Sequence, residues 1–139
     1  MNGVVHFEIP ADNLNRANKF YSTVFGWKLE TPKGMEGMYI MARTTEVDKK
    51  TMMPAKPGVI NGGIMKRTGE GGDNAPVLVI DVPSLDEYVK RAVKAGSKVV
   101  QEKQKVMDMG WYARVTDSEG NVIGIWETIP KKEAVAVRA

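Results

Sequence analysis

The stretch VVHFEI, residues 4–9, holds the only histidine of the 139-residue chain, and a glutamate follows two positions later. The run is short and rich in β-branched residues, which predicts a strand. Side chains alternate across a strand, so His6 and Glu8 share one face while Val5, Phe7 and Ile9 share the other. The face with His6 and Glu8 could supply a proton-transfer base or a metal ligand. Alternatively, His6 is a buried polar residue whose hydrogen bonds are made within the fold. Two ionisable groups are costly to bury without water or a partner, which favours the wall of a pocket.

The carboxylate of Glu8 is expected to act directly on the neighbouring imidazole. A negative charge nearby stabilises a protonated histidine, so we expect the pKa of His6 to be raised and its charged form favoured.

Two helices and two sets of strands are predicted around this first strand. One helix, over 13–26, starts with Asp12 or Asn13 as its cap and ends at Gly26. The second, over 84–96, starts with a capping box of Ser84 and Glu87. The remaining strand patterns cover 27–30, 38–43, 58–67, 75–82, 98–103, 110–117 and 121–129.

These elements form two copies of one strand–helix–three-strand unit, over about 3–67 and 75–130, joined by a glycine-rich connector. We therefore predict one domain over residues 1–139, with a frayed tail over 131–139. The expected fold class is α+β: two βαβββ units form a curved mixed sheet that cups a cavity, with the helices outside.

Composition excludes several function classes. With 42% hydrophobic and 27% charged residues, the chain is expected to fold as a globular protein. The net charge of +3 is spread over mixed acidic and basic residues, so nucleic acid is not an expected partner. No cysteine and no apolar run of about 20 residues occur, which excludes thiolate chemistry and argues against a membrane span. The start of the chain shows no secretion signal, and we expect a cytoplasmic protein.

Three stretches carry a family resemblance that covers nearly all of residues 4–129. They are HFEIPADNLNRANKFYSTVFGWKLE and INGGIMKR in the first unit, and GWYARVTDSEGNVIGIWE in the second. The chain resembles the vicinal oxygen chelate superfamily of glyoxalases, bleomycin-resistance proteins and dioxygenases, and most of all its glyoxalase-related members. The resemblance implies paired βαβββ units and a homodimer.

The resemblance also implies a divalent metal held by up to four side chains, two from each unit. His6 matches the first of these positions. The equivalent first-strand position of the second unit lies among residues 75–77, and the closing-strand glutamates are replaced by Gly63 and Gly124. Because His6 is the only match, we predict no metal ligand set and no cofactor. A divalent ion such as Zn, Ni, Fe or Mn is the alternative.

Bulky side chains follow both glycines at a spacing of two. On a strand, Met65 shares the face of Gly63 and Trp126 shares the face of Gly124, so the two side chains either wall a ligand cavity or simply fill space. Tyr112 and Arg114 alternate on the strand before the last hairpin. Arg114 has two readings: a contact for an anionic substrate group, or a surface ion pair, which the pattern favours slightly.

Three functions remain open from the sequence. The first is a lactoylglutathione lyase-like lyase or isomerase acting on a small carbonyl compound or thiol adduct, with His6 and Glu8 as catalytic residues and Met65, Tyr112, Arg114 and Trp126 binding the substrate. The second is a metal-free protein that binds or sequesters a small molecule, as in drug resistance. The third is a dimeric interaction domain with a vestigial pocket. His6 and Glu8 are expected on the face of the sheet that lines the cavity, and this argues against a vestigial pocket.

Overall fold

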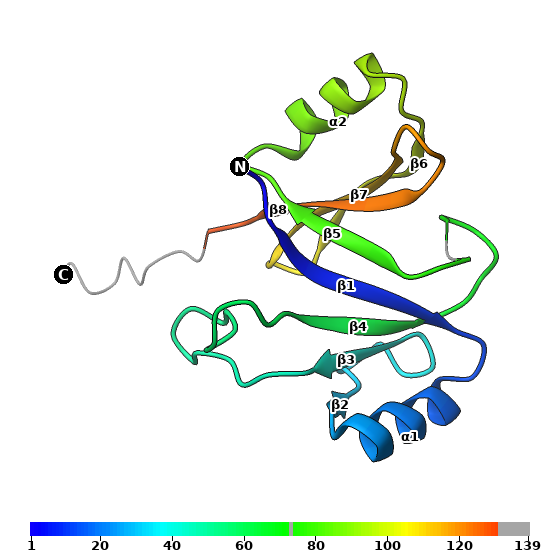
Figure 1. Ribbon diagram of the computed structural model, residues 1–139, viewed down its shortest axis with the longest axis vertical. Coiled ribbons are helices and arrows are strands. Elements are labelled where there is room, and N and C mark those ends of the chain that lie inside the picture. Colours follow the sequence, from blue (N-terminus) through cyan, green and yellow to red (C-terminus); the bar gives the residue numbers. More distant parts are fainter. Residues whose placement is uncertain (73, 131–139) are drawn as a thin grey trace. The chain divides into compact units, whose positions relative to one another are not determined.

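The computed structural model describes residues 1–72 and 74–130 and divides the chain into two compact units. The first unit covers Gly3–Ile80 together with Met1, and the second begins at Asp81 and includes Asn2. Figure 1 shows the order strand–helix–three strands twice along the chain. The elements are β1 (Val4–Ala11), α1 (Leu14–Phe25), β2 (Lys28–Glu30), β3 (Tyr39–Arg43), β4 (Asn61–Lys66), β5 (Val77–Asp81), α2 (Leu85–Lys94), β6 (Val99–Val106), β7 (Gly110–Thr116) and β8 (Val122–Thr128).

This order confirms the predicted α+β class and the two βαβββ copies. The compact units divide after Ile80 rather than in the glycine-rich connector, because most of β5 pairs antiparallel with β1. A single domain over residues 1–139 stays a prediction. The expected frayed tail, 131–139, lies outside the described residues.

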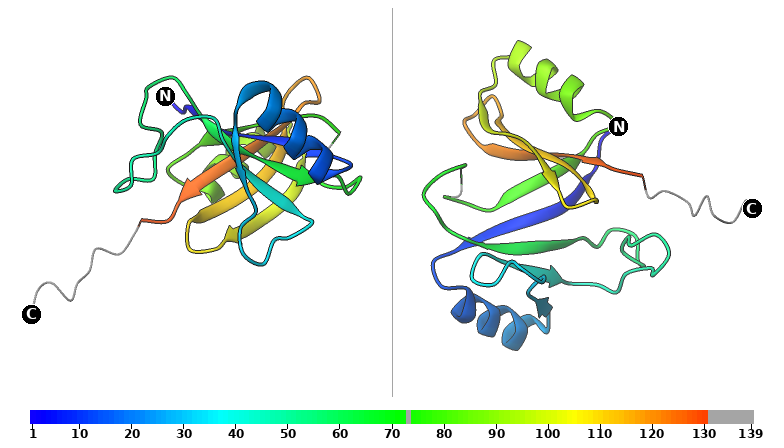
Figure 2. Two further views of the ribbon diagram at one scale, coloured as in Figure 1. Left: turned by 90° about the horizontal axis from the view of Figure 1, so that it is seen from below. Right: turned by 180° about the vertical axis from the view of Figure 1, so that it is seen from behind.

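In the first unit the strands follow the order β2-β3-β4-β1-β5. β1 runs parallel to β4, and the other neighbours are antiparallel. The long crossover that a parallel pair needs contains α1, which packs against β2, β3 and β4 (Figure 2). The core of this unit consists of the buried residues Leu14, Ile40, Ala42 and Ile64, with Phe7, Ile9, Tyr21 and Trp27 packed around them.

In the second unit the strands follow the order β8-β7-β6, and α2 packs against all three. Its buried apolar side chains include Leu85, Val115 and Ile125. Because side chains alternate along a strand, the residues that do not face α2 lie on the opposite face of the sheet.

The helix ends agree with the sequence except in one detail. Asn13, and not Asp12, caps α1 by accepting from the Arg16 N–H at 2.9 Å, and Gly26 ends it in the left-handed conformation at φ 71°. Ser84 caps α2 through the Glu87 N–H at 3.3 Å. A capping box also requires the Glu87 side chain to accept from the backbone N–H of Ser84, and this half of the prediction is wrong.

The Glu87 carboxylate instead binds Arg91 at 2.7 Å. Since the two residues are one helical turn apart, this is an ordinary i,i+4 ion pair on the helix surface.

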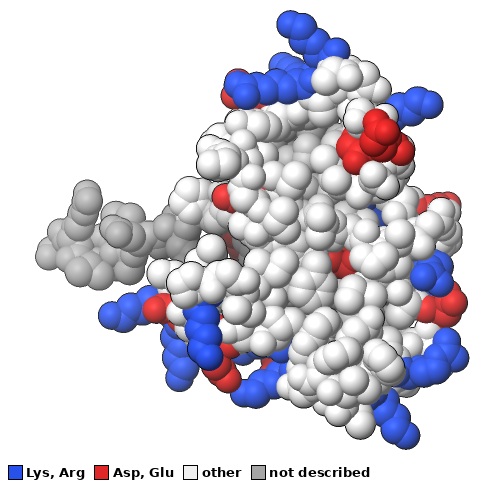
Figure 3. Space-filling view, viewed as in Figure 1, with Lys and Arg blue, Asp and Glu red and all other residues white. Residues whose placement is uncertain are grey.

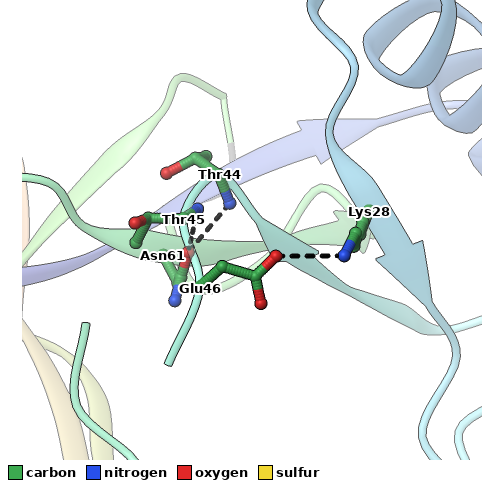
Figure 4. A network of polar contacts seen from close by, with 5 residues as sticks. All are labelled: Lys28, Thr44, Thr45, Glu46 and Asn61. Atoms are coloured by element: carbon green, nitrogen blue, oxygen red, sulfur yellow. Dashed lines mark hydrogen bonds and ion pairs between the residues drawn. The ribbon is translucent and has the colours of Figure 1, made fainter. Parts of the chain in front are cut away.

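Asn61, the first residue of β4, holds the chain that leaves β3. Its Oδ1 accepts from the backbone N–H of Thr44 at 2.8 Å and of Thr45 at 3.0 Å (Figure 4). The Thr44 hydroxyl donates to the Ile60 carbonyl at 2.6 Å, while Lys28 and Glu46 form an exposed ion pair nearby. One side chain therefore fixes the end of β3 against β4, and Asn61 is also the cross-strand partner of His6.

Asn61→Ala removes the acceptor of two backbone N–H groups. We expect the free energy of unfolding to fall by about 1–3 kcal/mol, because half-buried donors then lack a partner. Asn61→Asp keeps the oxygen and is the matched control. Urea denaturation followed by tryptophan fluorescence measures both variants, and an equal loss in the two would show that the acceptor oxygen is not what matters.

Candidate functional site

His6 and Glu8 lie on the face of β1 turned away from α1. Their neighbours Phe7 and Ile9 pack on the apolar core beneath the helix, so alternation directs the two polar side chains to the other face. Both are half-buried. In the register of the sheet, His6 lies between Asn61 of β4 and Val79 of β5. The predicted division of this strand into a polar and an apolar face is confirmed.

Tyr39, the first residue of β3, contacts the imidazole. Its hydroxyl oxygen lies 3.3 Å from Nε2 of His6. Tyr39 pairs with Met65 across the β3–β4 ladder, and Met41 pairs with Gly63. The ring of Tyr39 leans diagonally over Gly63, where an added Cβ would overlap its hydroxyl.

Tyr39 was not among the site residues predicted from the sequence. A signal was available in the alternation of Tyr39 and Met41, but only the strand register shows that this tyrosine lies beside His6.

Burial lowers the pKa of His6 below its ordinary value of 6.5, because the charged ring loses hydration. The carboxylate of Glu8 acts in the opposite direction and is the smaller effect. The expectation of a raised pKa was therefore wrong: the sign of the Glu8 effect was right, but desolvation exceeds it. At neutral pH the imidazole is uncharged and can accept a proton.

In the second unit, Tyr112 and Arg114 of β7 lie on the face turned away from α2. Arg114 is only 3% exposed, and its Nε donates to the Tyr112 hydroxyl at 2.9 Å. The reading of Arg114 as a surface ion pair is wrong, because the side chain is buried. A Cβ atom at Gly124 would lie 2.5 Å from the Tyr112 hydroxyl oxygen, so this ring covers its glycine as Tyr39 covers Gly63.

Trp126 of β8 is the cross-strand partner of Tyr112 and shares its face. Its ring covers Gly110, and its Nε1 donates to the Thr128 hydroxyl at 2.9 Å. The structure thus brings together Tyr112, Arg114 and Trp126 in the second unit. In the first unit it places Met65 beside Tyr39, the residue that contacts His6.

Glu127 lies on the opposite face of β8. Its carboxylate accepts from the Leu85 N–H at 2.7 Å, at the N-terminus of α2. Glu127 therefore caps an N–H group at the start of the helix and does not share the face of Tyr112 and Trp126.

The residues present do not fit the metal site of related proteins. A catalytic divalent ion needs about three protein ligands. Of the four family positions only His6 is a ligand residue, and Tyr39 and Tyr112 cover the two glycines that replace carboxylates. Among residues 1–72 and 74–130, no three histidine, aspartate or glutamate side chains are grouped so that they could hold an ion.

The surface charges follow the sequence expectation. On the face drawn in Figure 3, basic and acidic side chains of the described residues are interspersed, and the basic ones do not form one stripe. In the part of the chain that the structure describes, no helix is long and apolar enough to cross a membrane.

Comparison with known proteins assigns the family. The model of the Glyoxalase/Bleomycin resistance protein/Dioxygenase superfamily matches residues 3–125. The chain belongs to this superfamily. The predicted resemblance is therefore confirmed, over most of the chain.

Individual relatives are distant. The chain is 25% identical over 124 residues to "Putative glyoxylase CFP32" of Mycobacterium bovis, covering 86% of this chain but 43% of that protein. It is 29% identical to a "Glyoxylase-like domain-containing protein" of Didymella fabae, covering 85% of this chain and 88% of that one. The crystal structure of methylmalonyl-CoA epimerase from Mycobacterium tuberculosis is similar with a TM-score of 0.62 at 19% identity, covering 99% and 92% of the two chains. At that identity the likeness concerns the fold.

The protonation of His6 can be measured directly, because the chain has one histidine. We expect an NMR titration of its ring to give a pKa below 6.5, and Glu8→Gln to lower the value further by removing the nearby negative charge. Since the folded state resists protonation, stability should fall as the pH drops from about 6.5 through the folded pKa, and His6→Gln should lose that dependence. A pKa above 6.5 would contradict the dominance of desolvation.

Proposed function

We propose that the protein transforms a small carbonyl compound or thiol adduct by proton transfer, as a glyoxalase-related lyase or isomerase that uses no metal. The observation that supports this most is an uncharged imidazole, half-buried beside a carboxylate, at the position where relatives hold a metal ligand. A neutral histidine with a pKa close to the working pH is an effective general base.

The proposed step rearranges a carbonyl compound that carries a hydroxyl group on the neighbouring carbon, as a hemithioacetal does. His6 removes the C–H proton of that neighbouring carbon, and the electron pair of the broken bond forms an enolate. The proton then returns to the former carbonyl carbon, while the hydroxyl proton passes to the former carbonyl oxygen and a new carbonyl forms at the neighbouring carbon, so that the overall oxidation state does not change. Glu8 stabilises the imidazolium that exists between the two transfers.

Four further residues are proposed to bind the substrate. Met65 and Trp126 offer apolar surface on the helix-free faces of their sheets, and Tyr112 and Arg114 offer a hydroxyl and a buried guanidinium. Arg114 is proposed to contact an anionic substrate group, because a guanidinium binds carboxylates in a fixed geometry. Assembly as a homodimer and residence in the cytoplasm remain proposals from the sequence.

His6→Ala tests the proposal. With EDTA-treated protein in D2O and the hemithioacetal of methylglyoxal and glutathione as the probe, proton NMR should show turnover by the unmodified chain. His6→Ala should slow this turnover by about 10²–10⁴-fold, since it removes the general base. The rate should also fall as the pH decreases through the pKa of His6.

The same variant separates a functional from a structural histidine. We expect the free energy of unfolding to change little, because removing the imidazole also removes the cost of burying it. A loss of about 1–3 kcal/mol with turnover unchanged would identify His6 as a structural residue. The probe signals could instead broaden without turnover, and broaden less with His6→Ala. That result would favour the alternative of a small-molecule binding protein.

A further inference from the structure

A cavity of about 340 Å³ lies in the first unit, where β1 leads into α1. Three small apolar residues, Pro10, Ala11 and Ala17, leave room for it, and aromatic and charged side chains complete its lining. This volume and this mixture of apolar surface with a few polar groups are typical of small-molecule sites. None of the lining residues belongs to the site proposed above, so the cavity is a separate place on the molecule.

Two aromatic rings of α1 form part of the lining. Phe20 is 53% exposed, and its ring meets Tyr21 edge-on at a centroid distance of 5.1 Å. Tyr21 in turn stacks on Trp27 at 4.8 Å, with 10° between the ring planes. These contacts hold the Phe20 ring in place although half of it meets solvent. A flat apolar ligand can therefore pack on this ring at a low cost of ordering the side chain.

The charged side chains of the lining carry one positive charge in excess. The backbone N–H of Arg67 donates to the Ala11 carbonyl at 2.8 Å, and its guanidinium binds the Asp12 carboxylate at 3.0 Å. This ion pair balances the acidic residue of the lining. Within residues 1–72 and 74–130, the guanidinium of Arg16 makes no hydrogen bond or ion pair. The lining therefore favours a negatively charged ligand.

We propose that this cavity binds a small aromatic carboxylate. The ring of the ligand packs on Phe20, and its carboxylate accepts hydrogen bonds from the Arg16 guanidinium. The two residues are one helical turn apart on α1, so their side chains are neighbours on the helix surface and both reach a ligand of a single ring. A guanidinium binds a carboxylate through two parallel hydrogen bonds, which selects this group over a neutral or cationic one.

Benzoate is the probe, and its binding is followed in ¹H–¹⁵N spectra of the full chain at pH 7. We expect saturable shifts of backbone amides around the cavity, among them those of Asp12, Ala17 and Arg67, with a Kd of about 1 mM for a ligand of this size. Benzyl alcohol keeps the ring without the charge and should bind about fivefold more weakly. Equal affinity of the two probes, or no saturable shift with benzoate, would overturn the proposal.

Two pairs of variants on α1 test the contacts. Arg16→Gln should weaken benzoate binding about fivefold and leave benzyl alcohol unchanged. Lys19→Gln is the matched control, because it removes an exposed positive charge of the same helix outside the cavity. Phe20→Ala should weaken both probes, whereas Val24→Ala, which shortens an exposed apolar side chain outside the cavity, should weaken neither. Equal effects within either pair would overturn the proposal.

Two further measurements separate this cavity from other sites of binding. His6→Ala should leave benzoate binding unchanged, because His6 does not line the cavity. Loss of binding in this variant would place benzoate in the site proposed for turnover, which overturns this inference and not the proposed function. A second copy of the chain is the other candidate occupant. Shifts of the same amides when the protein alone is diluted about tenfold would assign the cavity to such a contact and overturn the proposal.

Discussion

The structure of the first unit depends on the alternation of side chains along β1, which is fixed between a parallel and an antiparallel neighbour. Phe7 and Ile9 lie under α1 and complete the core. Alternation along the strand therefore places His6 and Glu8 on the opposite face. A slip of one residue would bury both ionisable groups in the core and expose the apolar ones, at a cost that one small domain cannot offset. The chemistry of the site is thus a consequence of how the core is packed.

Burial at this position decides the charge state of the His6 imidazole. Desolvation lowers the pKa of His6 more than Glu8 raises it, so the ring is uncharged at neutral pH although a carboxylate lies nearby. The glycines at the former ligand positions admit tyrosine rings where relatives have carboxylates. Neutral hydroxyl groups and an uncharged imidazole therefore lie where the metal site of related proteins would need charged ligands.

Much of this could be predicted from the sequence, because the signals are local. Helix caps at Asn13 and Ser84, the positive φ of Gly26 and the faces of β1 follow from residue type and period. The contact between Tyr39 and His6, the burial of Arg114 and the pKa of His6 could not be predicted in the same way. Each depends on which strands pair, on their register and on how much water still contacts the side chain. A short window of sequence does not determine any of these.

The family position of His6 makes metal binding the most direct test of the account. The ¹⁵N and ¹³C signals of its imidazole can be followed while one equivalent of Zn²⁺ or Ni²⁺ is added to the purified protein at pH 7. We expect no specific shift of the ring, because the described residues place no second and third ligand beside this histidine for a stable complex. A saturable shift at equimolar metal, abolished in His6→Ala, would contradict it.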